Sequence, residues 1–146
     1  MVVFINQSKS LETKDILEIE QKLSVEIPKY LKEFYLFTNG GEIKDDKCIF
    51  IDKNGNDYNI KTFLPMKYRR FEDDILFEEL TIHFISKKLL QSNFLVFAID
   101  WGGFPFCYNV DDDAIYFYDL DIGNVLFLAN SIREFLMNIT TEEEAF

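Results

Sequence analysis

The sequence predicts a single domain of the α+β class, with helices and antiparallel strands in separate parts of the chain. Three observations lead to this fold class. Apolar residues recur at helical spacing near both ends, short apolar runs alternate with turn residues in the second half, and 146 residues suffice for one core. Hydrophobic residues make up 48% of the chain, and sixteen are Phe, so the chain is expected to fold.

The first predicted helix covers residues 13–23, TKDILEIEQKL. Its apolar face is made by Ile16, Ile19 and Leu23. Thr13 is placed to cap the N-terminus, and Asp15 stands in the first turn, where the helix dipole favours a negative charge. We therefore expect an amphipathic helix that packs on the core.

A second helix is predicted in IPKYLKEFYLFTNGG, with Pro28 at a first helical position. Its apolar stripe is Tyr30, Leu31, Phe34, Tyr35 and Phe37. The helix must end at Asn39, Gly40 and Gly41, because Gly and Asn adopt positive φ at little steric cost. A phosphate-binding loop would have its glycines before a helix, so we interpret this pair as a C-cap and exit.

The middle of the chain predicts a β-hairpin over residues 47–60 and a helix over residues 76–90. Asn54-Gly55 is the strongest short hairpin signal in the sequence, and it lies between two strand-like runs. The helix is predicted from an apolar face formed by Leu80, Phe84, Ile85 and Leu89.

Four strands in meander order are predicted between residues 94 and 129. FLVFAID is a nearly continuous apolar run that suits a central strand. Turns at WGG, Asp111–Asp113 and Asp121–Asn124 separate it from the runs FPFCYNV, AIYFYDL and VLFLA. The second Gly pair, Gly102 and Gly103, is therefore expected to turn the chain between two strands.

The chain is predicted to close with a helix in NSIREFLMNI. Ser131 and Glu134 form a capping box ahead of the buried face, which is Ile132, Phe135, Leu136 and Ile139. The acidic segment TEEEAF that follows is expected to be frayed. Cys48 and Cys107 stand in apolar runs, where two buried thiols are expected rather than a disulfide.

Several separated motifs match the pattern of one family in order. They are I-x-x-x-E at Ile16–Glu20, the IPKYLKEF helix ending at NGG, FAIDWGGFPFCY at Phe97–Tyr108, IYFY from Ile115, and the closing NSIREFL. On these residues the sequence resembles the SUKH superfamily, the Smi/Knr-type proteins. The resemblance covers nearly the whole chain.

The resemblance implies a fold and two kinds of function. One domain over residues 1–146 would pack its helices against a mostly antiparallel, curved sheet of about five to six strands. Bacterial members are mainly immunity proteins that bind and neutralise a toxin domain, often a nuclease, of a contact-dependent or polymorphic toxin system. Eukaryotic members act as interaction modules in cell-wall and growth signalling. Neither role carries a catalytic residue, a metal or a cofactor over to this chain.

The charge of the chain argues against direct binding to nucleic acids. Its 26 acidic and 15 basic residues give a net charge of -11, the wrong sign for neutralising phosphates. The same charge repels an anionic membrane and attracts a basic protein. The N-terminus has no signal-peptide pattern, and no run is long enough to span a membrane, so a cytoplasmic monomer is expected.

The predicted function is stoichiometric occlusion of a cognate toxin. A nuclease presents a basic groove to its substrate, and an acidic protein can occupy that groove. The candidate partner-binding residues are Glu72, Asp73, Asp74, Glu78, Glu79, Trp101, Asp111, Asp112 and Asp113. Trp101 is interpreted either as an anchor of its loop or as an exposed contact, and Asp100 as an acceptor for N–H groups of the turn.

Two alternatives stay open. A regulatory interaction module without a toxin partner, as in the eukaryotic branch, fits the same residues. An enzyme ranks third, because a cation could bind Asp111–Asp113 with Asp119 and Asp121, although the spacing lacks the D-x-D-x-D-G loop. His83 is the only histidine, and its apolar neighbours indicate packing rather than catalysis.

Overall fold

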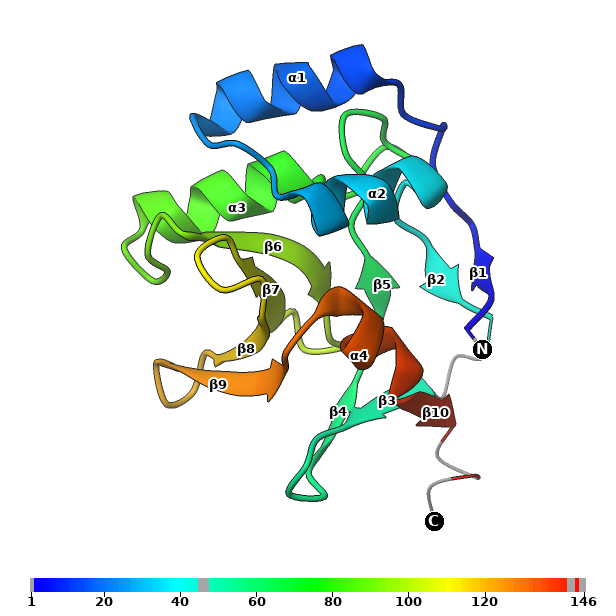
Figure 1. The fold of residues 1–146 in the computed structure, drawn as a ribbon, viewed down its shortest axis with the longest axis vertical. Coiled ribbons are helices and arrows are strands. Elements are labelled where there is room, and N and C mark those ends of the chain that lie inside the picture. Colours follow the sequence, from blue (N-terminus) through cyan, green and yellow to red (C-terminus); the bar gives the residue numbers. More distant parts are fainter. Residues whose placement is uncertain (1, 45–47, 142–143, 145–146) are drawn as a thin grey trace.

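Helices and strands of the described residues, 2–44, 48–141 and 144, form an α+β domain in this computed structural model (Figure 1). The helices are α1 (Thr13–Leu23), α2 (Lys29–Phe37), α3 (Phe77–Ser86) and α4 (Ile132–Met137). The strands are β1 (Phe4–Ile5), β2 (Glu42–Ile43), β3 (Cys48–Ile51), β4 (Asp57–Asn59), β5 (Thr62–Phe63), β6 (Phe94–Ile99), β7 (Pro105–Asn109), β8 (Ile115–Asp119), β9 (Asn124–Ala129) and β10 (Ile139–Thr141). The predicted fold class is confirmed.

The strands pair antiparallel in three sheets. The largest has the order β5-β6-β7-β8-β9, and its last four strands are the predicted meander. A second sheet, β10-β3-β4, contains the predicted hairpin, whose strands close with Ile51 opposite Asp57. The third is a short ribbon of β1 and β2. The sequence does not predict β1, β2 or β10, because two or three residues carry too short a pattern.

The helices are divided between two ends of the molecule. Figure 1 shows α1, α2 and α3 together at one end, and α4 beside the three-stranded sheet at the other. Helix α3 flanks β6, where the Thr81 hydroxyl accepts the Val96 N–H at 2.9 Å. This bond satisfies a buried backbone donor and places α3 against the sheet.

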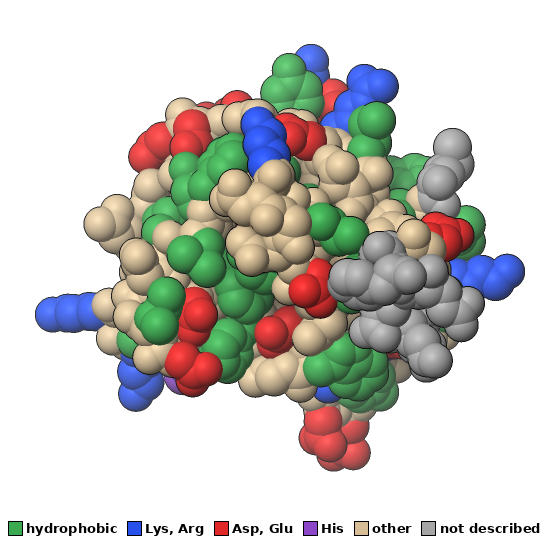
Figure 2. All heavy atoms as spheres, turned by 90° about the horizontal axis from the view of Figure 1, so that it is seen from below, with side chains coloured by type: hydrophobic (Ala, Val, Ile, Leu, Met, Phe, Trp, Pro, Cys, Tyr) green, Lys and Arg blue, Asp and Glu red, His purple; other side chains and the backbone are tan. Residues whose placement is uncertain are grey.

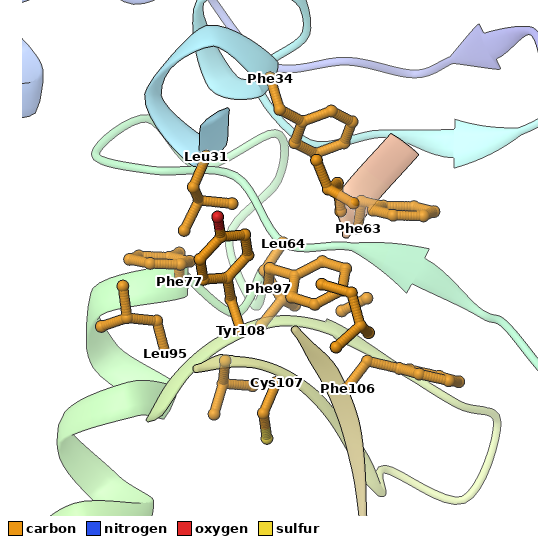
Figure 3. Close-up of a cluster of buried hydrophobic side chains, with 14 of the residues drawn as sticks. Leu31, Phe34, Phe63, Leu64, Phe77, Leu95, Phe97, Phe106, Cys107 and Tyr108 are labelled. Atoms are coloured by element: carbon orange, nitrogen blue, oxygen red, sulfur yellow. The ribbon is translucent and has the colours of Figure 1, made fainter. Parts of the chain in front are cut away.

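Aromatic side chains fill the core between these layers. In Figure 3, Tyr108 of β7 points toward Leu31 of α2 and lies beside Phe77 of α3. On the other side, Phe135 of α4 stacks on Phe50 with ring centroids 4.8 Å apart. Burial of such rings is the main stabilising term for a domain of this size.

Helix α1 covers the predicted residues, but its N-cap and the start of α2 each differ by one residue from the prediction. Glu12, not Thr13, is the N-cap of α1, and its N–H donates to the Asp15 carboxylate at 2.9 Å. In α2, Pro28 is the N-cap, and the first helical residue is Lys29. Both differences have the same cause: the residue at which a helix begins depends on backbone geometry, and a sequence pattern locates it only to within one or two positions.

The first Gly pair turns the chain, but its predicted role as a helix C-cap is wrong. Helix α2 ends at Phe37, and its C-cap Thr38 is extended. Gly40 has φ +71°, and a Cβ there would lie 2.7 Å from the Pro65 nitrogen. Gly41 exchanges two backbone hydrogen bonds with Phe63, at 3.0 and 2.8 Å. The pair is therefore needed for close backbone approach to the β5 segment.

The later elements follow the prediction with shorter helices. Helix α3 ends at Ser86 rather than at residue 90, and Lys88 has φ +59°. In α4 the Ser131 hydroxyl accepts the Glu134 N–H at 3.0 Å, as the capping-box motif predicts. Glu134 in turn accepts the N–H of Asn130 at 2.9 Å.

The cysteines and the C-terminal segment complete the comparison. Cys48 and Cys107 are both buried, and Cys107 is a free thiol whose pKa is raised by burial. Ile139 belongs to β10 rather than to the last helix. Of the predicted acidic tail, positions 142, 143, 145 and 146 lie outside the described residues.

Candidate functional site

The loop between β6 and β7 holds Trp101 in an exposed position. The Asp100 carboxylate accepts the N–H groups of Gly102 at 2.9 Å and Phe104 at 2.8 Å. The backbone N–H of Trp101 donates to the Asn59 side-chain oxygen on β4 at 2.8 Å. The predicted role of Asp100 is confirmed, and backbone N–H groups make the hydrogen bonds that brace the loop. The Trp101 side chain stays 58% exposed.

A cleft of about 250 Å³ opens beside this loop. We call it the Trp101 cleft, and its lining includes Trp101, Phe71, Ile75, Thr62, Ile99 and Asp73. Phe71 is 59% exposed and Ile75 is 40% exposed, so apolar groups stand on both sides of the opening. Exposed aromatic and aliphatic side chains around a hollow are typical of a protein-binding surface.

The polar floor of the Trp101 cleft is already satisfied. The Arg70 guanidinium forms a two-pronged pair with the buried Asp74 carboxylate at 2.8 Å and donates to the Thr62 hydroxyl at 3.0 Å. Burial acts to raise the pKa of Asp74, but the hydrogen bonds from Arg70 outweigh it and hold the pKa below its usual value. The floor is therefore a neutral ion pair, and it does not attract a charged ligand strongly.

The rim of the Trp101 cleft carries charges that are still available. The Lys61 ammonium lies 5.5 Å from the centre of the Trp101 ring, a cation–π contact. Asp73 and Glu42 line the same hollow. Within the described part of the chain, none of these three side chains forms an ion pair. A partner can therefore meet these groups without breaking an existing salt bridge.

The sequence of the chain matches the model of one known protein family. The family model described as SMI1 / KNR4 family (SUKH-1) matches residues 11–138, which include the Trp101 loop and the cleft. The chain belongs to the SMI1/KNR4 family. Among curated proteins, none matches this sequence. The family membership confirms the SUKH resemblance seen in the separated motifs.

The acidic residues predicted around α3 of this SUKH-1 chain lie in three different environments. Glu72 and Asp73 are exposed, and Glu79 is exposed but pairs with Arg69. Asp74 and Glu78 are buried, at 5% and 3% exposure. A buried carboxylate cannot contact a partner directly, so Glu72 and Asp73 are the groups that remain free for one.

Glu78 is an unusual buried acid in this SUKH-1 domain. Its Oε2 accepts the backbone N–H of Lys67 at 3.0 Å, whereas Oε1 has no hydrogen-bond partner among the described residues. Burial raises the pKa of this carboxyl group. Such a group supports the loop that leads into the cleft, but it is closed off from solvent.

The predicted acidic turn Asp111–Asp113 lies at the other end of β7 from Trp101. Five residues of strand separate them, which is roughly 17 Å. The three carboxylates also point to different partners, because Asp112 accepts the Tyr116 hydroxyl and Asp113 the Tyr108 hydroxyl, both at 2.7 Å. The structure therefore does not bring this turn and the Trp101 cleft together in one pocket.

The side chains that could bind a metal ion are dispersed in the described residues of the SUKH-1 chain. No three or more of their His, Cys, Asp and Glu side chains are grouped to hold a metal ion. Asp119 accepts the N–H groups of Asp121 and Ile122 in its own turn. His83 lies exposed on α3, against the ring of Phe84. None of the described helices has the length and apolar character to cross a membrane.

The sequence does not predict the apolar part of the cleft. Phe71 and Ile75 flank the acids in FEDDI, and Lys61 comes from a different segment. The available signal is the placement of two large apolar residues inside a charged, non-helical stretch. Such residues are either covered by the fold or left exposed for a partner, and the sequence alone does not distinguish the two.

Proposed function

We propose that this SUKH-1 protein is a cytoplasmic immunity protein that binds a cognate toxin domain and blocks it by stoichiometric occlusion. The observation that carries the proposal is the exposed Trp101, held on a braced loop beside an apolar cleft. The exposed Asp73 lines the same cleft, and the exposed Glu72 precedes it in the chain. The protein acts as a monomer and without catalysis.

Trp101 has the properties of an interface anchor. Tryptophan dominates binding energies at protein interfaces, because its large flat surface loses water without losing much conformational entropy. The loop is fixed by Asp100 and Asn59, so little ordering is required on binding. Phe71 and Ile75 extend the apolar contact on the other side of the cleft.

The acidic charge favours a basic partner such as a nuclease toxin. A nuclease needs a positively charged groove for its substrate, and a protein with net charge -11 is drawn to that groove. Figure 2, seen from the side of β4 and β9, shows carboxylates spread between apolar side chains, with Lys and Arg mainly at the outline. Apolar anchors would then supply affinity, and the carboxylates speed and specificity.

Calorimetric titration tests this function directly. The titrant is an inactivated form of the C-terminal toxin domain encoded beside the gene of this protein. We expect one-to-one binding with a Kd of about 1 nM or tighter. Absence of binding to that domain would contradict immunity and favour the regulatory module of the Smi/Knr type.

A matched pair of variants then tests the site. Trp101→Ala should weaken binding by about 2 kcal/mol or more, roughly a thirtyfold increase in Kd. Phe37→Ala removes an aromatic side chain that is 80% exposed and does not line the cleft, so its Kd should stay unchanged. If the two variants bind equally well, the Trp101 cleft is not the interface.

A further inference from the structure

The outer face of β8 and β9 is apolar and only partly covered. Tyr116 of β8 lies opposite Phe127 of β9, and Tyr118 lies opposite Val125. Phe84 of α3 reaches the Tyr118 ring, with centroids 6.2 Å apart, and buries it. No described element of the chain covers Phe127, which is 45% exposed.

A groove of about 350 Å³ lies on this face. We call it the β8 groove, and its lining includes Leu89, Asn93, Phe94, Tyr116, Tyr118 and Val125. Leu89, from the segment after α3, is 44% exposed. The rings of Phe94, Tyr116 and Phe127 continue one another, with centroids 5.4 and 5.8 Å apart. The apolar surface therefore extends from the groove onto β9.

Carboxylates stand at both ends of the β8 groove. At one end Asp112 accepts the Tyr116 hydroxyl at 2.7 Å, and Asp111 accepts the Asn93 amide at 3.2 Å. At the other end Asp121 is exposed in the turn after β8, two residues before Gly123, which lines the groove. The described residues that line the groove include no Lys or Arg.

We propose that the β8 groove is a second docking surface and that it binds a basic amphipathic helix of a partner protein. The proposal does not depend on the Trp101 cleft, because the two surfaces share no lining residue. The apolar stripe of the helix would lie on Leu89, Tyr116 and Phe127. Its Lys and Arg side chains would reach the carboxylates at the two ends.

The geometry favours a helix over an extended peptide. Backbone groups of β8 are already paired with β7 on one side and β9 on the other, so a strand cannot add to it. The edge strand β9 is irregular at one end, because Ile115 pairs with Ala129 whereas Tyr116 pairs with Phe127. Contact with the groove, which lies over β8, must therefore be made through side chains. The ring spacing is close to the ~5.4 Å rise of one helical turn, so residues one turn apart can meet successive rings.

Fluorescence anisotropy with a synthetic peptide tests the proposal on the full chain. The probe is a labelled helix of about 14 residues, with Leu at positions i, i+3, i+4 and i+7 and Lys elsewhere. The same composition in a scrambled order is the comparison peptide. We expect the amphipathic peptide to bind at least tenfold more tightly than the scrambled one at 0.15 M salt.

Protein variants locate the binding. The pair Leu89→Ser with Phe127→Ser should weaken peptide binding at least tenfold, whereas Phe37→Ser and Trp101→Ala should leave it unchanged. All four positions are exposed, and circular dichroism checks that each variant is folded. Equal binding of both peptides, or equal loss in Phe37→Ser, would overturn the proposal. So would loss in Trp101→Ala, which would assign the peptide to the Trp101 cleft.

A second copy of the chain is the rival occupant, and its test is the mass in solution. Light scattering during size exclusion should give a monomer at the concentrations of the titration. A dimer that the Leu89→Ser with Phe127→Ser pair converts to monomer would show that the groove closes on itself, and would overturn binding of a partner helix.

Discussion

At the scale of single residues, Asp15, predicted as a first-turn charge favoured by the helix dipole, has further roles in the structure. Its carboxylate accepts the Glu12 N–H and also pairs with the Lys67 ammonium at 2.7 Å. These bonds, led by the one from Glu12, lower the pKa of Asp15 to about 2 from an ordinary value of 3.8. The ion pair joins α1 to the segment before the cleft.

The pH dependence of stability should therefore contain a contribution from Asp15. A lowered carboxyl pKa in the folded state stabilises the protein above pH 3.8, and this stabilisation is lost as the pH falls through about 2. We expect Asp15→Asn to have a lower Tm at pH 7 and a shallower loss of Tm between pH 4 and 2. Thermal melts across this range measure both effects. Asp57→Asn, at an exposed residue without an ion pair among those described, is the control and should follow the wild type.

Glu78 should change the pH dependence of stability in the opposite direction to Asp15. Its pKa is raised by burial above the ordinary value of 4.5, so the folded state holds its proton more firmly than the unfolded state. Stability from this group is present below pH 4.5 and falls as the pH rises through the raised value. Glu78→Gln should therefore increase the free energy of unfolding at pH 8 by about 1 kcal/mol. Urea unfolding at pH 4 and 8 checks this, and a loss of stability at both pH values would contradict it.

The burial of two acidic residues could not be predicted from the sequence. Asp74 and Glu78 stand in a charged stretch that indicates a solvated surface. Their burial depends on Arg70 and on the Lys67 N–H, which only the folded loop places beside them. Asp100 was predictable, because the acceptor and the turn that it stabilises lie within four residues of each other.

At the scale of elements, the Gly40–Gly41 turn tests the tightest backbone contact. At Gly40 a Cβ would lie 2.7 Å from the Pro65 nitrogen and 2.8 Å from the Phe63 oxygen, so neither neighbour can yield easily. We expect Gly40→Ala to lower the free energy of unfolding by about 3 kcal/mol. Gly55→Ala is the matched control, since Gly55 has φ +82° but open space around it, and its cost should be about 1 kcal/mol. Urea unfolding followed by circular dichroism distinguishes the two, and equal losses would show that φ alone matters.

Elements with local signals were predictable, and elements made by distant pairing were not. The strands β6 to β9 follow from apolar runs separated by the turns at Asp111–Asp113 and Asp121–Asn124. In contrast, β10 exists because Ile139 pairs with Phe50, almost ninety positions earlier. The end of α2 was misjudged for a similar reason, since Gly40 is required by Pro65 and Phe63 rather than by the helix.

At the scale of the whole molecule, the Trp101 cleft is formed by segments that lie far apart in the sequence. Lys61, Phe71 and Trp101 come from three separate connections, and the pairing of β5 with β6 brings the segments around them together. Trp101 was predictable as a candidate contact, while its neighbours in the cleft were not. The acidic turn that was predicted with it lies at the far end of β7 and borders the β8 groove instead.

The proposed acidic contact can be separated from the effect of net charge by two double variants. Glu72→Lys with Asp73→Lys changes the charge beside the Trp101 cleft by four units. Glu26→Lys with Glu33→Lys makes the same change at exposed acids on and before α2, away from the cleft. Both lower the overall attraction for a basic partner, but only the first alters the field at the proposed contact.

We expect the first pair to slow association with the toxin domain about tenfold or more at low salt, and the second pair much less. The difference should shrink at 0.15 M salt, where charges more than about 8 Å apart are screened. Stopped-flow association rates at both salt concentrations measure it. If both pairs slow binding equally at low salt, only the net charge of -11 guides the encounter, and the acids beside the Trp101 cleft are not in the interface.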